Sequence, residues 1–170
     1  LAIDTSSSMA GAALAAATAA GRSFVDLIDL PRDRAAVVSF DGAARVVQPL
    51  TTSRPRLRTG LANLATGIGT RLDLGLGAAV DLLATGARAG ARPVIVLLTD
   101  GLPDPGTEAA ALAEGARARS HGMTVFAVGL GDRAAVDLLR RLTADPSLVR
   151  FAPSAEELAS AYAAIAGDVG

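Results

Sequence analysis

The sequence contains no cysteine, no lysine and no tryptophan, and each absence excludes a class of site. Without cysteine there are no disulfides, no thiolate metal ligands and no cysteine nucleophile, and the composition leaves the redox compartment open. All 16 basic residues are arginines, 17 acidic residues balance them, and a single tyrosine leaves no aromatic platform on which bases would stack. We therefore expect no nucleic-acid partner.

Long apolar segments are missing as well. The longest weakly apolar run, residues 9–21, is mostly alanine and is too short to span a bilayer. Hydrophobic residues make up 51% of the 170 residues and charged residues 19%, which is enough to bury a core. Because no linker or repeat interrupts residues 1–170, we expect a single, monomeric domain. The chain opens inside a predicted strand, so we expect the start of that strand to be missing and the domain to come from a longer protein, in a compartment that the sequence does not indicate.

Apolar runs of strand length alternate with segments of helical periodicity, which is typical of a parallel α/β sheet with helices on both faces. An Asp41-Gly42 turn joins the second and third strands, which predicts an antiparallel hairpin. Pro49 places the third strand at the sheet edge, since proline cannot donate a ladder hydrogen bond. The predicted strands cover residues 1–4, 36–40, 44–48, 93–100, 124–129 and 148–151, and the predicted helices lie within 9–28, 51–65, 70–83, 107–120, 132–142 and 154–165.

The first predicted strand ends in a carboxylate that is followed by hydroxyl residues. Asp4 precedes Ser6 and Ser8 in a loop at the carboxyl end of a strand, where open α/β sheets bind their ligands. A carboxylate and two hydroxyls that turn the same way are hard oxygen ligands suited to Mg²⁺ or Mn²⁺. The alternative is that Ser6, Ser7 or Ser8 simply caps the helix that follows.

Two further oxygen ligands stand in loops predicted at the same edge of the sheet. Thr70 follows the glycine-rich stretch at residues 67–69 and precedes a helix. Asp100 ends a strand that is apolar at every position from 94 to 98, as expected of a central strand covered on both faces. Thr70 also has a plain structural explanation, because together with Asp73 it loosely matches a capping box.

These five residues, in this order, resemble the metal-ion-dependent adhesion site of the von Willebrand factor A domain family, in its bacterial form. The family's motif is Asp-x-Ser-x-Ser, then a distant Thr and a distant Asp, and it is matched by Asp4, Ser6, Ser8, Thr70 and Asp100. The stretches Ile-Asp-Thr-Ser-Ser-Ser-Met, Gly-Thr-Arg-Leu-Asp-Leu-Gly-Leu and Leu-Leu-Thr-Asp-Gly also look like the family's, although Ser7 stands where many relatives have glycine. The resemblance covers the whole chain and implies a doubly wound, Rossmann-like sheet of six strands in the order 3-2-1-4-5-6 with one antiparallel edge strand.

The resemblance also implies a non-enzymatic module for protein–protein interaction and cell adhesion. In the family the Ser and Thr hydroxyls coordinate Mg²⁺ or Mn²⁺ directly, the aspartates act partly through water, and the sixth position receives a Glu or Asp carboxylate from a protein partner. An ion held by two carboxylates and three neutral hydroxyls keeps charge available for that carboxylate. Asp4→Ala and Thr70→Ala are then expected to abolish partner binding and to leave the fold intact.

Two alternatives stand beside the binding module. A Mg²⁺-dependent phosphohydrolase would use Asp4 as its nucleophile, but such enzymes need a second Asp where this chain has Ser6, and no lysine is present to balance a phosphoryl group. A Ser-His-Asp hydrolase would need His121, which precedes Gly122 at a predicted helix end on the opposite edge of the sheet. The other alternative is a metal-free scaffold domain with the same fold.

Overall fold

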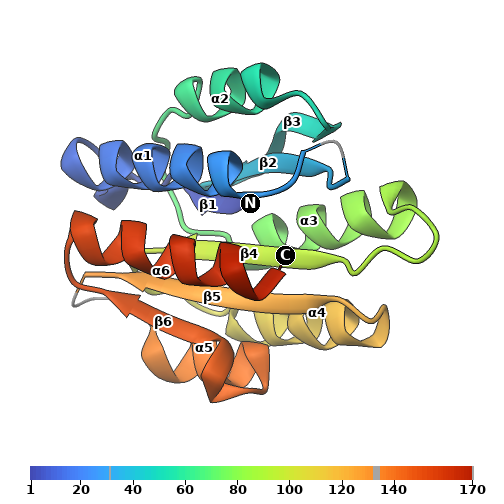
Figure 1. Ribbon diagram of the computed structural model, residues 1–170. Coiled ribbons are helices and arrows are strands. Elements are labelled where there is room, and N and C mark those ends of the chain that lie inside the picture. The colour runs from blue at the N-terminus through green and yellow to red at the C-terminus, as the bar shows by residue number, and fades with distance from the viewer. Residues whose placement is uncertain (31, 132–134, 170) are drawn as a thin grey trace.

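Six strands form one sheet in the computed structural model, which describes residues 1–30, 32–131 and 135–169 (Figure 1). Their order is β3-β2-β1-β4-β5-β6, and every neighbouring pair is parallel except the β2–β3 hairpin. The predicted order, the doubly wound arrangement and the antiparallel edge strand are confirmed. The strands are β1 (Ala2–Asp4), β2 (Ala35–Phe40), β3 (Ala44–Thr51), β4 (Val94–Thr99), β5 (Thr124–Leu130) and β6 (Val149–Ala152).

The α-helices form a layer on each face of the sheet. Figure 1 shows α1, α2 and α6 on one face and α3, α4 and α5 on the other, and each group packs on its own apolar cluster. The helices are α1 (Ala12–Leu27), α2 (Arg54–Ala62), α3 (Leu72–Gly86), α4 (Glu108–Ser120), α5 (Val136–Thr143) and α6 (Ala155–Val169). None of the helices described here is long and apolar enough to cross a membrane.

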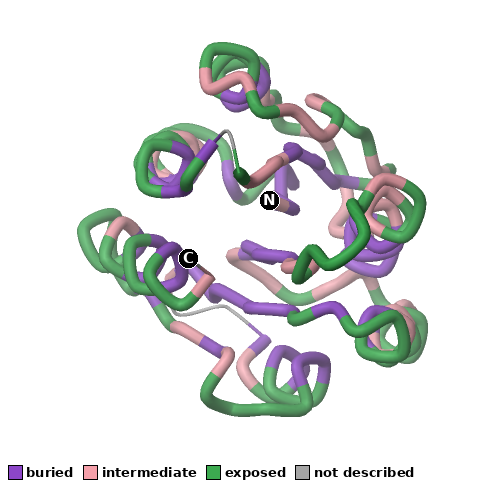
Figure 2. The backbone as a smooth tube through the Cα atoms, turned by 45° about the vertical axis from the view of Figure 1, so that its right-hand side comes forward, coloured by how far each residue is buried: buried purple, intermediate pink, exposed green. Residues whose placement is uncertain are grey.

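The core divides between the two faces because successive strand residues point in opposite directions. In β4, Val96 and Leu98 belong to the cluster under α1, α2 and α6, whereas Ile95 and Leu97 belong to the cluster under α3, α4 and α5. All four are buried, and the four inner strands β2, β1, β4 and β5 form the buried interior of the molecule in Figure 2. The prediction that this apolar run forms a central strand covered on both faces is therefore confirmed.

Two helix starts show how local signals set the boundaries. The helix predicted from residue 9 begins at Ala12, because the chain first makes a 3₁₀ turn at Ser7–Met9 and then passes through Gly11 with φ +81°. A left-handed residue of this kind interrupts a helix and suits glycine. One of the two bonds of the capping box predicted for α6 is present, since the Glu157 backbone N–H donates to Ser154 Oγ at 3.3 Å. The turn predicted at Asp132 lies outside the described residues.

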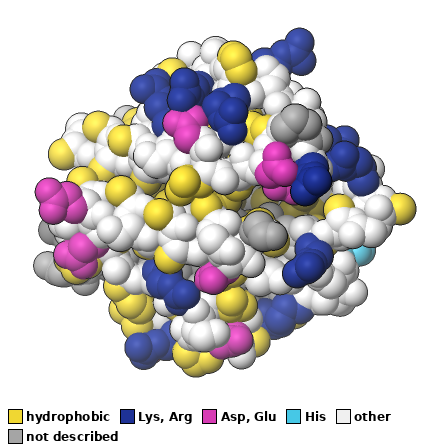
Figure 3. Space-filling model, viewed as in Figure 1, with side chains coloured by type: hydrophobic (Ala, Val, Ile, Leu, Met, Phe, Trp, Pro, Cys, Tyr) yellow, Lys and Arg dark blue, Asp and Glu magenta, His cyan; other side chains and the backbone are white. Residues whose placement is uncertain are grey.

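Arg54 and Arg58 lie four residues apart in α2, and that spacing by itself indicates a solvated face. In the structure they instead reach α1, where Arg54 Nε lies 3.3 Å and Arg58 Nη2 2.7 Å from the Asp26 carboxylate. In Figure 3, arginine side chains gather around an acidic side chain at the top of the molecule, over α1 and α2. Because both partners are partly exposed, these pairs orient α2 on α1 more than they stabilise the fold.

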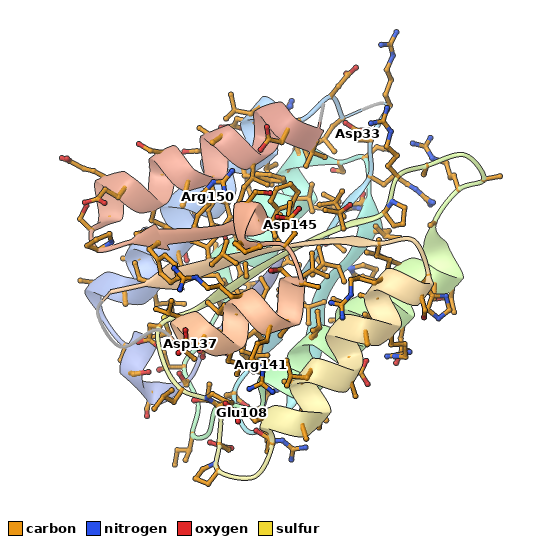
Figure 4. All side chains as sticks on the ribbon, turned by 90° about the horizontal axis from the view of Figure 1, so that it is seen from below. Asp33, Glu108, Asp137, Arg141, Asp145 and Arg150 are labelled. Atoms are coloured by element: carbon orange, nitrogen blue, oxygen red, sulfur yellow. The ribbon has the colours of Figure 1, made fainter. Side chains whose placement is uncertain are left out.

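A cavity of about 580 Å³ opens at the amino-terminal edge of the sheet. Ala2 pairs with Val38 and Leu97, whereas β2 already starts at Ala35 and β4 at Val94, so the first residues of these two strands have no β1 residue between them. Asp33, which lines this cavity, lies at the opposite end of the molecule from Glu108 at the start of α4 (Figure 4). The cavity is therefore remote from the loops that follow β1 and β4.

Candidate metal-binding site

Asp4, the last residue of β1, is held rigidly at the carboxyl edge of the sheet. Its side chain is fully buried, and each carboxylate oxygen accepts a hydrogen bond. Oδ1 accepts from the Ser6 backbone N–H at 2.8 Å, and Oδ2 accepts from the Thr99 hydroxyl at 2.6 Å. Thr99 ends the neighbouring parallel strand β4, so the two strand ends meet here. We therefore expect Asp4→Ala to lower the stability of the fold as well, because it would leave the buried Ser6 N–H without a partner and the Thr99 hydroxyl with only the Gly101 carbonyl at 3.4 Å.

The hydroxyls of the first loop face one another and the loop after β4. Ser6 Oγ lies 3.0 Å from Ser8 Oγ, and the Ser8 hydroxyl donates to Asp100 Oδ1 at 2.8 Å. Neither serine serves a helix: Ser6 makes no side-chain cap on the 3₁₀ turn, and α1 has Gly11 at its N-cap. The capping interpretation of these serines is not borne out, and their hydroxyls are available for another purpose.

Thr70 lies in a third loop that is fastened to the other two through backbone groups. Gly67 forms an isolated parallel bridge with Ser6, and its N–H donates to the Thr5 carbonyl at 2.8 Å. On the other side, the Thr70 N–H donates to Asp104 Oδ1 at 2.9 Å, and the Asp104 N–H donates to the Thr70 carbonyl at 3.0 Å. No hydrogen bond joins the Thr70 hydroxyl to Asp4, Ser6, Ser8 or Asp100, all of which the structure describes. The structure thus links four of the predicted residues directly and places Thr70 in an adjoining loop.

The predicted capping box at Thr70 and Asp73 is wrong, because α3 begins one residue later with Arg71 at its N-cap. The Arg71 N–H donates to the Asp41 carbonyl at 2.7 Å, which ties the loop to the β2–β3 turn. Asp73 instead pairs with the Arg71 guanidinium, whose Nε and Nη2 lie 2.9 and 2.7 Å from the two carboxylate oxygens. The Arg71 guanidinium lowers the pKa of Asp73. The Thr70 hydroxyl is consequently not used to start the helix.

The electrostatics of the cluster favour a cation. Burial raises the pKa of Asp4, hydrogen bonds from Thr99 and Ser6 oppose that rise, and the negative charge of Asp100 adds to it. Neither Asp4 nor Asp100 forms a salt bridge with any residue that the structure describes. Two neighbouring carboxylates without a positive partner would both be stabilised in their charged form by a bound cation.

The donor set and its spacing fit a small, hard ion. In an octahedron of oxygens about 2.1 Å from Mg²⁺, neighbouring oxygens lie about 3.0 Å apart. The Ser6–Ser8 and Ser8–Asp100 oxygen separations are 3.0 and 2.8 Å. The described part of the chain brings together no three His, Cys, Asp or Glu side chains in a metal-binding arrangement, so the candidate site consists of carboxylates and hydroxyls alone. Such oxygen donors suit Mg²⁺ or Mn²⁺ better than softer metals.

Sequence reasoning missed three residues that position this cluster. Thr99 ends β4 directly before Asp100, which puts its hydroxyl at the sheet edge. Asp104 lies in the loop between β4 and α4, and nothing in its neighbours along the sequence indicates that it binds Thr70. Gly67 permits its loop to lie against the β2–β3 turn, since a Cβ at this position would be 2.3 Å from Asp41 Oδ2. Only Thr99 had a usable sequence signal, its position directly before Asp100 at the end of an apolar run.

Solved structures with the same fold include bacterial pilus proteins and a mussel matrix protein. The vWF domain of the type V pili tip protein Mfa5 from Porphyromonas gingivalis matches with a TM-score of 0.86 at 20% identity, over 98% of this chain and 92% of that chain. The pilus adhesin SpaC from Lactobacillus rhamnosus GG matches with a TM-score of 0.84 at 18% identity, over 99% of this chain and 30% of that chain. Proximal thread matrix protein 1 from the mussel byssus has zinc in its MIDAS (metal-ion-dependent adhesion site) motif. It matches with a TM-score of 0.79 at 18% identity, over 96% of this chain and 44% of that chain.

These structural likenesses establish the fold, and this chain spans less than half the length of the last two proteins. A comparison with curated proteins gave no match. The family profile described as the von Willebrand factor type A domain matches residues 1–164, which is nearly the whole chain. Together with the sheet order and the loops after β1 and β4, this match means that the chain belongs to the von Willebrand factor type A domain family.

Proposed function

We propose that this domain is a non-enzymatic protein-binding module that holds Mg²⁺ or Mn²⁺ at a metal-ion-dependent adhesion site and presents it to a Glu or Asp of a protein partner. The ion would be held by Ser6, Ser8, Thr70 and Asp100, together with Asp4, which would act through water because both of its oxygens already accept hydrogen bonds. The observation that carries the proposal is the convergence of oxygens from Ser6, Ser8 and Asp100, 3.0 and 2.8 Å apart, beside the Asp4 carboxylate, with no salt bridge to either aspartate among the described residues. Related folds in a pilus adhesin and a zinc-occupied matrix protein support it.

The partner's carboxylate follows from the charge balance. Asp4 and Asp100 bring the only negative charges to this donor set, and the remaining three donors are neutral hydroxyls. Both oxygens of Asp4 already accept hydrogen bonds from Ser6 and Thr99, which leaves them less able to neutralise the ion. The ion would supply a positive charge that an anionic oxygen satisfies better than water does. A Glu or Asp side chain is the usual source of such an oxygen on a protein surface.

The contacts of Asp4 also argue against catalysis. An aspartyl nucleophile needs a carboxylate oxygen that faces its substrate, whereas Asp4 is fully buried with both oxygens bonded. His121 stands at the C-cap of α4, a helix of 13 residues and therefore about 20 Å long, whereas the Asp100 loop leads into the other end of that helix. A Ser-His-Asp arrangement at this edge would need a different histidine.

Titration with Mn²⁺, followed by the electron paramagnetic resonance of the free ion, tests the proposed ligands. Ser6→Ala, Ser8→Ala and Thr70→Ala should each weaken Mn²⁺ binding by roughly tenfold or more, because each removes one oxygen from the ion. Ser7→Ala is the matched control, since Ser7 lies between two of the ligands and should leave the affinity unchanged. Equal affinity in all four variants would contradict the site.

The same titration tests the partner's chemistry by linkage. If a carboxylate completes the ion's coordination, a short glutamate-containing peptide must raise Mn²⁺ affinity by the same factor by which Mn²⁺ raises peptide affinity. The glutamine version of the peptide should have no effect. A Mg²⁺-dependent hydrolysis of p-nitrophenyl phosphate that Asp4→Asn removes would instead support the phosphohydrolase, and a chain indifferent to metal would support the scaffold.

A further inference from the structure

Two apolar side chains stand out into solvent beside the candidate metal site. Ile68 is 89% exposed and Leu102 is 71% exposed, which makes them the most exposed large apolar residues of the described chain. Ile68 lies two positions before Thr70, and Leu102 lies two positions after Asp100. Neither belongs to either apolar core. The two residues, here called the apolar rim, thus occupy the loops that carry two of the proposed ligands.

The backbone holds both loops in place. The Ile68 carbonyl accepts from the Gly42 N–H at 2.7 Å, so the loop around Ile68 is tied to the β2–β3 turn. The loop that carries Leu102 is joined to Thr70 by the two Asp104 hydrogen bonds of 2.9 and 3.0 Å. The apolar rim is therefore presented on loops that the fold fixes next to the hydroxyl and carboxylate cluster.

Folding gives no reason for this exposure. A single exposed apolar residue is ordinary on a protein surface, but two on adjoining loops beside a polar cluster indicate a binding surface. The other large apolar side chains on the surface are less exposed, for example Leu27 at 58% and Val46 at 43%. Interfaces combine a desolvated apolar contact with a few placed polar bonds, which is the combination found here.

The charges at this edge favour an apolar partner over a polyacidic one. Arg45 Nη1 lies 2.7 Å from the Asp41 carboxylate, and Arg71 Nη2 lies 2.7 Å from that of Asp73. Among the described residues of these loops both arginines are already paired, so a second acidic side chain on the partner would have to share a guanidinium with Asp41 or Asp73. Selection among carboxylate-bearing partners would then fall to the apolar rim.

We propose that Ile68 and Leu102 set the specificity of the metal site, and that its partner is a protein segment whose Glu or Asp is flanked by apolar side chains. This inference rests on the proposed function. The ion attracts any accessible carboxylate, whereas the rim adds apolar contact only when the neighbouring residues are apolar. Covering the rim also keeps water from the ion–carboxylate bond, which strengthens that bond.

Two peptides that differ only beside the glutamate provide the test. Ac-Ala-Leu-Glu-Leu-Ala-NH₂ and Ac-Ala-Ser-Glu-Ser-Ala-NH₂ would be titrated into the domain in Mg²⁺ and followed by chemical shifts in its NMR spectrum. The leucine peptide should bind roughly fivefold tighter or better, because its side chains bury apolar area against the rim. Equal affinities would overturn the inference.

Variants of the rim separate this inference from the proposed function. Ile68→Ser and Leu102→Ser should reduce the leucine peptide's affinity to that of the serine peptide, and should leave serine-peptide and Mn²⁺ affinities unchanged. Leu27→Ser, at the end of α1, is the matched control and should change none of them. A retained leucine preference in both rim variants would overturn the inference alone, whereas failure of the unmodified domain to bind Mn²⁺ would overturn the proposed function with it.

Discussion

Millimolar Mg²⁺ should raise the melting temperature of this domain by about 5–10 °C over its value in EDTA. Binding to the folded state alone adds about 2.7 kcal/mol at a concentration a hundred times the dissociation constant, and 1 kcal/mol corresponds to about 2–4 °C in a chain of this length. The physical reason is the pair of carboxylates, Asp4 and Asp100, which have no positive partner among the described residues. Differential scanning calorimetry in the two solutions measures the shift.

The ligand variants sharpen this experiment. Ser6→Ala and Ser8→Ala should lose the Mg²⁺ shift, whereas Ser7→Ala should keep it. Asp4→Ala should also have a lower melting temperature in EDTA. Its free energy of unfolding should fall by about 1–3 kcal/mol for each buried donor that loses its acceptor, namely the Ser6 N–H and the Thr99 hydroxyl. Asp4→Asn preserves the shape of the side chain and separates the loss of charge from the loss of packing. Identical midpoints with and without millimolar Mg²⁺ would count heavily against the proposed site.

Gly75→Ala should lower the free energy of unfolding by about 3 kcal/mol, a large effect for one methyl group. A Cβ at Gly75 would lie 2.3 Å from Phe40 Cδ1 and 2.4 Å from Phe40 Cγ. The Phe40 side chain is fully buried in the apolar cluster between α3 and the sheet. The overlap outweighs the gain of about 1 kcal/mol that alanine brings to a helix interior.

Gly77→Ala is the matched control, because Gly77 is also buried in α3 and gains the same helix propensity. The nearest atom to its added Cβ would be Glu114 Cδ at 3.3 Å, near the end of a side chain that can shift slightly. This variant should therefore be as stable as the parent chain or slightly more so. Urea unfolding of both variants measures the difference, and two equal midpoints would mean that Phe40 can move away after all.

Gly75 also connects the fold to the site. The Phe40 carbonyl accepts from both the N–H and the hydroxyl of Thr5, at 2.7 and 3.1 Å, and Thr5 stands between Asp4 and Ser6. A shift of Phe40 would therefore displace the loop that carries the first proposed ligands. Gly75→Ala protein that remains folded should bind Mn²⁺ more weakly than Gly77→Ala protein.

Most of the fold could be read from the sequence, because it depends on local patterns. The spacing of apolar residues indicates which segments are strands and which are helices, and the Asp41-Gly42 pair between two apolar runs predicts a hairpin. The five proposed ligands were likewise recognisable by their order and residue type. That residues 1–170 form a single domain stays a prediction, as does the role of these five side chains.

The tertiary structure alone decided how those residues are held. The Thr99–Asp4 bond depends on the register between β1 and β4, and the Asp104–Thr70 pair depends on two loops that meet through the fold. The start of α3 was misjudged for the same reason, because Arg71 finds Asp41, a partner 30 positions away in the chain, so the helix begins one residue later. Sequence patterns record what a residue does to its neighbours along the chain, whereas these contacts join residues that only packing brings within hydrogen-bond distance.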